Sequence, residues 1–312
     1  MQFCVTSYNQ ENLIIQTLES IKYQVEHFQS NEKPSFALFD DCSSDMTVEY
    51  ATAWIELNRS LFSEVSICPS QKNKGIVKNF LSAVRSNPQK YCKEIAGDDL
   101  FAPFDIRKAF PNEGICLTPT IRFSGGKQEC IFSPALDLIS KERDPQKGFE
   151  KAKKFFSSRR FIEAPGVFYS KSFFFNEGLV NYLDKFSWIE DAPTWSYFFE
   201  QGCFEQSVCV DLTPYTLYRT SGGVSDFESE AECIYNEDWN LLEKDRKPYF
   251  SGLKKIESNV INVGLFAYGK IHQNDNKSYT TRINKSLDEI SEYISIIEGL
   301  AEESKELVLK KI

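Results

Sequence analysis

Two pairs of adjacent aspartates stand at the ends of short apolar runs in this chain. The run "FALFDD" ends in Asp40 and Asp41, and "IAGDD" ends in Asp98 and Asp99. Hard divalent cations such as Mg²⁺ and Mn²⁺ prefer oxygen ligands, and they often keep phosphate oxygens as co-ligands. A single pair is typical of a solvated acidic loop. Two pairs on the same edge of a sheet indicate a site for a metal and a nucleotide diphosphate.

The elements that must position these pairs follow from the spacing of apolar residues. Short β-branched and apolar runs predict strands, and apolar residues at helical spacing predict a helix after each of the first three. This alternation is typical of an open, largely parallel sheet, in which ligands bind beyond the carboxyl ends of the strands. Thr6 to Asn9 and both aspartate pairs therefore share one predicted rim. The strands are expected at residues 3–7, 35–41, 65–68 and 91–99.

The rest of the chain gives a coarser prediction. Strands are expected at 114–123, 164–175 and within 207–219, a helix at 141–156, and a loop entering a helix at 186–202. Residues 221–232 are the best candidate for a mobile loop. An apolar stripe predicts a terminal helix that packs on the domain, with a partner helix or a membrane-surface helix as alternatives. That stripe comprises Leu287, Ile290, Ile294, Ile297, Leu300 and Leu307.

Composition excludes some classes of protein. The net charge of -9, from 45 acidic and 36 basic residues, disfavours a general nucleic-acid binder, because affinity for phosphate depends on clustered Lys and Arg. Nine scattered cysteines without a C-x-x-C pair favour reduced thiols in a cytosolic protein. We see neither a secretory signal nor an apolar window long enough to span a bilayer. A soluble protein is expected, and peripheral membrane contact is not excluded.

Several segments, taken in order, resemble the family-2 glycosyltransferases with the GT-A fold. They are "VTSYNQENLIIQTLESI", "FDDCSSD", "NKGIVKNFLSA", "AGDD", "APGVFYSK" and "WIEDAPTW". The resemblance implies an α/β fold, a Rossmann-like GT-A sheet that is mostly parallel and flanked by helices, with a C-terminal helical extension. It implies a GT-A domain over residues 1–230, with a nucleotide-binding half at about 1–110 and an acceptor half at about 111–230. Residues 231–312 would form the mainly helical extension.

The resemblance also assigns a nucleotide-sugar site. Asp41, or its neighbour Asp40, would accept a hydrogen bond from the base, which is typical of uridine recognition. Gly75 would let the backbone approach the nucleotide, and Lys74 would offer a cation near phosphate, unless it is an ordinary exposed lysine. Ser43 and Asp45 would shape the turn and cap the next helix. The full set comprises Thr6, Ser7, Tyr8, Asn9, Glu11, Asp40, Asp41, Lys74, Gly75, Asn79 and Asp98.

The family's metal and its general base can be assigned in the same way. Asp99 would bind Mn²⁺ or Mg²⁺, and Asp98 would face the donor sugar or ribose. Asp191 would take the proton of the acceptor hydroxyl, with Glu190 beside it; alternatively, the pair only begins a helix, whose dipole favours acidic residues there. Trp188 and Trp195 would offer a stacking face to the acceptor sugar, or belong to the core. One carboxylate base without a second nucleophile favours inversion.

One departure from the family concerns the segment 218–225, which lacks a histidine that related enzymes often carry. Arg219, or Arg159 and Arg160, would replace its contact to metal or diphosphate, unless these arginines have a surface role.

The predicted function is therefore an inverting, metal-dependent glycosyltransferase. It would move a sugar from a nucleotide-diphosphate sugar, UDP-sugar favoured, to a hydroxyl of a glycan or lipid-linked saccharide in bacterial capsule, O-antigen or other surface glycan synthesis. It would work in the cytoplasm, with peripheral contact at the inner face of the plasma membrane, or oligomerisation through the C-terminal helix, left open. The rival classes are a nucleotidyltransferase, a receiver-like phosphoacceptor, and a degenerate transferase that only binds ligand.

Overall fold

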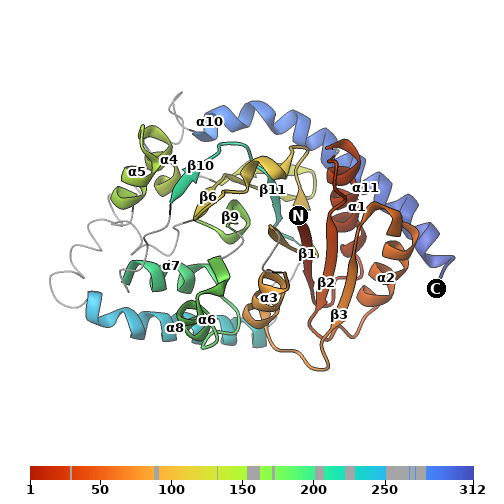
Figure 1. Ribbon diagram of the computed structural model, residues 1–312, viewed down its shortest axis with the longest axis horizontal. Coiled ribbons are helices and arrows are strands. Elements are labelled where there is room, and N and C mark those ends of the chain that lie inside the picture. The colour runs from red at the N-terminus through yellow and green to blue at the C-terminus, as the bar shows by residue number, and fades with distance from the viewer. Residues whose placement is uncertain are drawn as a thin grey trace.

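A computed structural model shows how the chain arranges these elements (Figure 1). It describes residues 1–28, 30–87, 91–131, 133–152, 162–170, 173–200, 207–221, 229–250, 267, 271 and 279–312. The N-terminal part is built on a four-stranded sheet in the order β3-β2-β1-β4, and all its neighbouring strands are parallel. The four strands are β1 (Gln2–Ser7), β2 (Ser35–Asp40), β3 (Val65–Pro69) and β4 (Cys92–Ala96), so the expected alternation is confirmed.

Helices cover both faces of this sheet. The helices α1 (Ile14–His27) and α2 (Thr47–Leu57) bury apolar side chains against one face, where Val5 and Leu38 point. The other face is covered by α3 (Ile76–Arg85), and there the buried contacts are small: Cys4, Ala37 and Ala83. Small side chains let a helix approach a sheet closely, which draws the start of α3 towards the carboxyl ends of β1 and β2.

Two further sheets complete the α/β body. The first has the order β5-β11-β7-β8, and the second has the order β10-β6-β9. The strand predicted at 114–123 is in fact two strands in different sheets, because the chain turns between them, where the Thr118 N–H donates to Gly166 O (2.7 Å). The strands are β5 (Leu100–Phe101), β6 (Ile115–Leu117), β7 (Thr120–Ser124), β8 (Lys127–Cys130), β9 (Val167–Tyr169), β10 (Val208–Val210) and β11 (Thr216–Arg219).

The second half differs most from the sequence-based expectation. Among the described residues of the strand expected at 164–175, only β9 is a strand, since short 3₁₀ turns, η4 (Ala164–Gly166) and η5 (Phe173–Phe175), flank it. In the described part of the helix expected at 141–156, one helix ends at Lys141 and a separate helix begins at Pro145. The helices here are α4 (Pro134–Lys141), α5 (Pro145–Ala152), α6 (Glu177–Leu183), α7 (Asp191–Glu200) and α8 (Ser229–Phe250).

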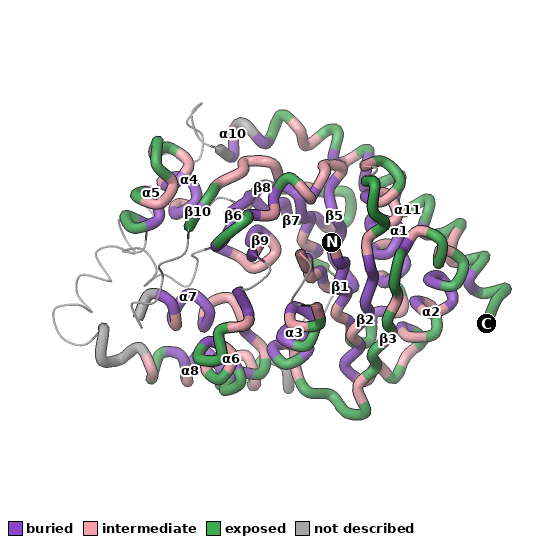
Figure 2. Tube along the Cα trace, viewed as in Figure 1, coloured by how far each residue is buried: buried purple, intermediate pink, exposed green. Residues whose placement is uncertain are grey.

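The C-terminal helix lies along the N-terminal half. After α10 (Tyr279–Ile283), α11 (Leu287–Leu309) packs against α1 and α2. This confirms the prediction of a terminal helix that packs on the domain. Its buried stripe, which Figure 2 shows in purple, contains Ile290, Ile294, Ile297, Ala301 and Val308. Leu300 and Leu307 were expected on this stripe but are 38% and 53% exposed. A straight helix repeats every 3.6 residues, so a seven-residue pattern drifts off the packed face.

Three further short 3₁₀ segments occur among the described residues. The segments are η1 (Arg59–Leu61), η2 (Ile106–Ala109) and η6 (Asn284–Ser286). No helix within the described ranges is long and apolar enough to cross a membrane. The segment predicted to be a mobile loop, 221–232, lies largely outside the described residues, which resume at Ser229 in α8.

Candidate active site

Asp40 lies at the carboxyl end of β2, where it ties two strand ends together. Its carboxylate accepts hydrogen bonds from Ser7 Oγ (2.9 Å) and from the Ser43 backbone N–H (2.8 Å). Ser7 and Asp40 are register partners in the parallel pair β1 and β2. Asp40 is 1% exposed and Asp41 is 3% exposed, so both carboxyl groups are buried and exposure does not distinguish between them.

The loops after β1 and β2 are joined by side chains that the sequence assigned to the nucleotide. Asn9 Oδ1 accepts the Ser44 N–H (2.8 Å), and Glu11 Oε2 accepts the Met46 N–H (3.0 Å). Asn9 has a positive φ of 51°, a conformation that asparagine tolerates better than most residues. These contacts shape the loop pair. Beside them Tyr8 is 36% exposed, which leaves much of its side chain accessible at the rim.

The turn before α2 matches its predicted capping role. Asp45 Oδ1 accepts the Thr47 N–H (3.0 Å) at the start of the helix, and its Oδ2 accepts the Glu11 N–H (3.0 Å). Ser43 Oγ receives the Asn9 N–H (2.8 Å). The loops after β1 and β2 thus form one hydrogen-bonded unit at the sheet edge.

Asp41 connects this unit to α3. Its two carboxylate oxygens accept the backbone N–H groups of Lys74 and Gly75, each at 2.8 Å. Burial raises the pKa of Asp41, and these two hydrogen bonds oppose the rise. Lys74 is exposed, and Asn79 donates from Nδ2 to Phe39 O (2.9 Å) at the end of β2. The start of α3 is thereby fixed over the rim.

Gly75 lies very close to the backbone of a neighbouring loop. Its φ is +88°, and an added Cβ would lie 2.8 Å from the carbonyl oxygen of Ser187. The Val77 N–H donates to the same carbonyl (3.2 Å). The structure shows a close backbone approach at Gly75 with Ser187, in the loop that leads to Glu190 and Asp191; the approach of Gly75 to a nucleotide stays a prediction.

Asp98 and Asp99 follow β4 and are held from β11. The Arg219 backbone N–H donates to Asp99 Oδ1 (2.8 Å), and Arg219 Nε donates to the Asp98 carbonyl (2.7 Å). The Arg219 guanidinium lies 4.4 Å from the centre of the Phe123 ring, and the residue is 8% exposed. A surface role for Arg219 is therefore wrong; its side chain is packed beneath the acidic pair. Arg159 and Arg160 lie outside the described residues.

Asp98 and Asp99 repel each other electrostatically. Burial raises the pKa of Asp99 well above its ordinary value, and Asp98 and Glu94 raise it further, while the Arg219 N–H opposes them. A divalent cation would relieve this repulsion. Within the described residues, no group of three or more His, Cys, Asp or Glu side chains is placed to hold a metal ion. Mg²⁺ commonly uses one or two carboxylates plus substrate phosphates, and the pair fits that kind of site.

Glu94 was not predicted from the sequence, yet it lines a cleft beside β4. It belongs to β4, and its Oε1 accepts the hydroxyl of Thr6 on β1 (2.6 Å). Burial raises the pKa of Glu94, and Asp98 contributes to the rise; Glu94 in turn raises the pKa of Glu190. The signal that could have revealed it is "CKEIA", where two charged residues interrupt a buried parallel strand.

Glu190 and Asp191 stand at the start of α7, and both are half-buried. Asp191 Oδ1 accepts the Ala192 N–H (2.6 Å), and Thr194 Oγ1 donates to Glu190 O (2.6 Å). Burial raises the pKa of Asp191, and it raises that of Glu190 well above the ordinary range, with further contributions from Asp191 and Glu94. The pair therefore begins the helix, and its carboxylates also lie within the electrostatic reach of Glu94.

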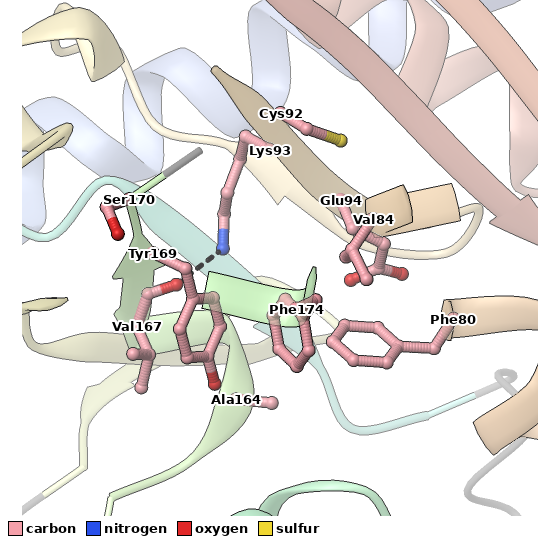
Figure 3. A pocket seen from close by; sticks show the side chains of 10 residues that line it. All are labelled: Phe80, Val84, Cys92, Lys93, Glu94, Ala164, Val167, Tyr169, Ser170 and Phe174. Carbon is pink, nitrogen blue, oxygen red and sulfur yellow. Dashed lines mark hydrogen bonds between the residues drawn. The ribbon is translucent and has the colours of Figure 1, made fainter. Parts of the chain in front are cut away.

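Aromatic side chains and Glu94 line a small cleft (Figure 3). The cleft has a volume of about 20 Å³, lies between α3, β4 and β9, and opens partly to solvent. Tyr169 and Phe174 are stacked edge to face with ring centres 4.6 Å apart, and Phe80 follows Phe174 at 5.2 Å. Burial raises the pKa of Tyr169, and Glu190, Asp191 and Glu94 raise it further. The Tyr169 hydroxyl is therefore within electrostatic reach of all three carboxyl groups.

Lys93 supplies a buried cation on the same strand. Its Nζ donates to the carbonyl oxygens of Pro165 (3.2 Å) and Val167 (3.3 Å), and the second bond is drawn in Figure 3. Burial lowers its pKa to about 8, against the pull of Glu94 and Asp99. Because its ammonium group donates to the backbone at and just before β9, we infer that Lys93 links the sheet that contains β4 to the sheet that contains β9.

The two tryptophans near Asp191 differ. Trp195 is 1% exposed and donates from Nε1 to Ile162 O (3.0 Å), so its suggested role in sugar stacking is wrong and its core role is confirmed. Trp188 is half-buried against the same core, and part of its ring stays accessible.

Comparisons with known proteins bear on the fold. Residues 2–111 match the sequence model of the family described as Glycosyl transferase family 2. No curated protein sequence matches the chain. Among solved structures, S. aureus TarS 1-349 in complex with UDP-GlcNAc matches with a TM-score of 0.51 and 13% identity, over 100% of this chain and 89% of that one.

Two further structures match less closely. TarS 1-349 with UDP gives a TM-score of 0.49 at 16% identity, covering 80% of this chain and 73% of that one. The mannosyltransferase PcManGT from Pyrobaculum calidifontis, with GDP-Man and Mn²⁺, gives 0.45 at 12% identity, covering 99% and 86%. The chain covers 44% of a longer TarS chain.

The fold class is therefore GT-A, with a parallel nucleotide-binding sheet, flanking helices and a C-terminal helix. The match to glycosyl transferase family 2 covers residues 2–111 of the 312, so glycosyl transfer by the whole chain is a proposal.

Proposed function

We propose that the chain transfers a sugar from a nucleotide-diphosphate sugar, with UDP-sugar favoured, to an acceptor hydroxyl with inversion. The observation that carries this proposal is the contact between the start of α3 and the loop that leads to Glu190 and Asp191. The Val77 N–H donates to Ser187 O (3.2 Å), and the neighbouring Gly75 N–H donates to Asp41 (2.8 Å). This contact supports a single site that joins the strand-end carboxylates, suited to the donor, with the helix-start pair, suited to the acceptor.

The donor would lie over the carboxyl ends of β1, β2 and β4. Asp41 would meet the base, because the Lys74 and Gly75 amides hold its carboxylate in place and each carboxylate oxygen can accept more than one hydrogen bond. Exposed Tyr8 would contact the nucleotide. Uridine is favoured by the resemblance of the loops after β1 and β2 to the family's uridine-binding pattern, and a solved structure with this fold, TarS, binds UDP-GlcNAc.

Asp98 and Asp99 would hold Mn²⁺ or Mg²⁺ together with the donor diphosphate. When bound, the metal would neutralise the charge that builds up on the departing nucleotide diphosphate. The Arg219 N–H fixes one oxygen of Asp99, so this carboxylate is oriented before any ligand arrives. By the resemblance to the family, Asp99 would be the metal ligand and Asp98 would face the donor sugar or ribose.

Asp191 would act as the general base. As the acceptor oxygen attacks the anomeric carbon, the bond from that carbon to the diphosphate oxygen breaks and the hydroxyl proton passes to the Asp191 carboxylate. Attack from the face opposite the leaving group inverts the anomeric centre. Burial of Asp191, which raises its pKa, makes the carboxylate a stronger base than one in water.

The acceptor would be a glycan or a lipid-linked saccharide in bacterial surface glycan synthesis, used on the cytoplasmic side. The exposed side chains Ile296, Leu300 and Leu307 of α11 support peripheral membrane contact or oligomerisation through this helix. We also propose a domain division at about residue 230, after which α11 returns to pack on α1 and α2.

The test is turnover by the purified chain. UDP-glucose, UDP-GlcNAc and GDP-mannose are each incubated with Mn²⁺, with Mg²⁺ or with a chelator, in the presence and absence of a panel of saccharide acceptors, and released nucleoside diphosphate is measured. We expect release from a UDP-sugar that depends on the metal and rises with one acceptor class. Absence of release from every donor under every condition would contradict the proposal.

A further inference from the structure

The loop that precedes Glu190 and Asp191 is held by a residue far along the chain. Asp238 lies on α8, outside the family match, and is 5% exposed. Its Oδ2 accepts three successive backbone N–H groups: Ser187 (3.0 Å), Trp188 (2.6 Å) and Ile189 (3.1 Å). Three successive amides that converge on one anion form a compact anion-binding arrangement, and hydrogen bonds to a carboxylate are stronger than neutral ones.

The opposite side of the same loop is held by α3. The Ser187 carbonyl accepts the Val77 N–H (3.2 Å), and Gly75 leaves room for this contact because it lacks a Cβ. The Ser187 residue is therefore bound through its N–H to α8 and through its carbonyl to α3. Two residues after Ile189 the chain reaches Asp191, so the position of this loop sets the position of the proposed base.

We propose that Asp238 is a positioning residue for catalysis, which fixes the 187–189 loop and thereby places Glu190 and Asp191 against the donor site. The inference rests on the proposed function. Asp238 contacts the backbone of the loop and has no role in contacting substrate. The start of α3 is also hydrogen-bonded to Asp41, so α3 fixes the position of the 187–189 loop relative to the proposed nucleotide-binding edge.

The prediction separates turnover from donor binding. A displacement of about 1 Å at a reacting group can lower a rate by about 100-fold, so Asp238→Ala should reduce kcat by about 10- to 100-fold. The Kd for UDP-sugar should stay within about twofold, because the donor rim is formed by β1, β2 and β4 and not by α8. Asp238→Asn keeps one oxygen that can accept the amides, so it should restore part of kcat.

The matched control is Asp245→Ala on the same helix. Asp245 lies two turns after Asp238 and makes only a peripheral ion pair with Lys185 (3.8 Å), at 32% side-chain exposure. It undergoes the same chemical change without releasing the 187–189 amides. We expect native kcat, native donor Kd and native thermal stability for this variant.

Hydrogen exchange gives a readout that does not depend on activity. In the native chain the Ser187, Trp188 and Ile189 amides should exchange slowly although Ser187 itself is exposed, and in Asp238→Ala their exchange should become faster than in Asp245→Ala. Rapid exchange of these amides in the native chain would overturn the inference even if Asp238→Ala did not fold. Native kcat in a folded Asp238→Ala would also overturn it. Failure of the proposed function would appear differently, as absence of turnover in the native chain.

Discussion

The proposed donor side and the proposed acceptor side are built in different ways. On the donor side, the loops after β1 and β2 and the start of α3 are joined by hydrogen bonds among residues that lie within the first 80 positions; Asp99 is the exception, because the distant Arg219 N–H holds it. On the acceptor side, the loop before Glu190 and Asp191 is held by contacts with Gly75 and Asp238, which are more than 40 residues away in either direction. The loops after β1 and β2 are thus specified locally, whereas the acceptor side depends on distant contacts.

This difference teaches where sequence change is tolerated. The donor side falls within the family match at 2–111, and the acceptor side lies beyond it. A strand-end motif keeps its geometry when the sheet is preserved, whereas a loop held from α3 and α8 can be moved by a change in either helix. Variants on the two sides should therefore separate binding from turnover.

The largest effect is expected on the acceptor side, for Asp191→Asn. The amide cannot take the proton of the acceptor hydroxyl, so transfer should fall by about 100- to 10,000-fold, the usual contribution of a general base. Donor Kd, measured by calorimetry, should stay near the native value. Glu190→Gln serves as the neighbouring control with a smaller loss. Near-native turnover by Asp191→Asn would exclude it as the base.

On the donor side, Asp99→Ala should weaken metal-dependent donor binding by about tenfold or more, since Mg²⁺ and Mn²⁺ depend on carboxylate ligands. It also leaves the buried Arg219 N–H without its acceptor, so stability should fall by about 1–3 kcal/mol. Asp98→Asn should weaken binding without that loss of stability. Asp105→Asn, at the start of η2, is the control. Equal metal dependence in the native chain and in both variants of the pair would remove the metal assignment.

Gly75→Ala tests the contact between the two sides. Its Cβ would lie 2.8 Å from Ser187 O at a φ of +88°, and such strained substitutions cost more than about 1 kcal/mol. Gly126→Ala is the matched control, because Gly126 has a φ of +79° with nothing within 4 Å. We expect Gly75→Ala to lower both the melting temperature and kcat more than Gly126→Ala does. Similar losses in the two variants would show that strain alone, without the contact to Ser187, accounts for the effect.

The smallest effect concerns pH and stability. The folded-state pKa of Glu190 is raised by burial, Asp191 and Glu94, so the folded state favours the protonated form. Its contribution to stability is present below the usual glutamate pKa of about 4.3 and is lost as pH rises through the raised value. The native chain should therefore gain melting temperature on going from pH 8 towards pH 5 relative to Glu190→Gln. An identical pH dependence in the two proteins would contradict this assignment.

The donor half could be predicted from the sequence because its signals are periodic and local. Strands β1 to β4, the helices between them and the strand-end aspartates follow from apolar spacing and from residues next to one another in the chain. The same reasoning failed at 114–123, where one apolar run serves two sheets, and at 164–175, where Pro165 accompanies a 3₁₀ turn. Sheet membership depends on distant partners that apolar spacing does not specify.

Within the site, the sequence predicted which residues lie at the sheet edge better than it predicted what their side chains contact. Asn9 and Glu11 were assigned to the nucleotide, and the structure shows their side chains joining two loops. Asp238 was missed because nothing local distinguishes a carboxylate that receives three distant amides, and for Glu94 the charges within a buried strand were a local signal that did not specify its partner. The partners of such groups, Thr6 and the 187–189 loop, are brought to them only by the fold.

The central claim is that the acidic rim binds a nucleotide-diphosphate sugar with a metal. Calorimetric titration of the native chain with UDP-glucose, UDP-GlcNAc and GDP-mannose, each with and without Mn²⁺, tests it most directly. We predict that a UDP-sugar binds and that Mn²⁺ tightens its binding, with Asp99→Ala removing most of the gain. Absence of binding by every nucleotide sugar, with and without Mn²⁺, would contradict the claim.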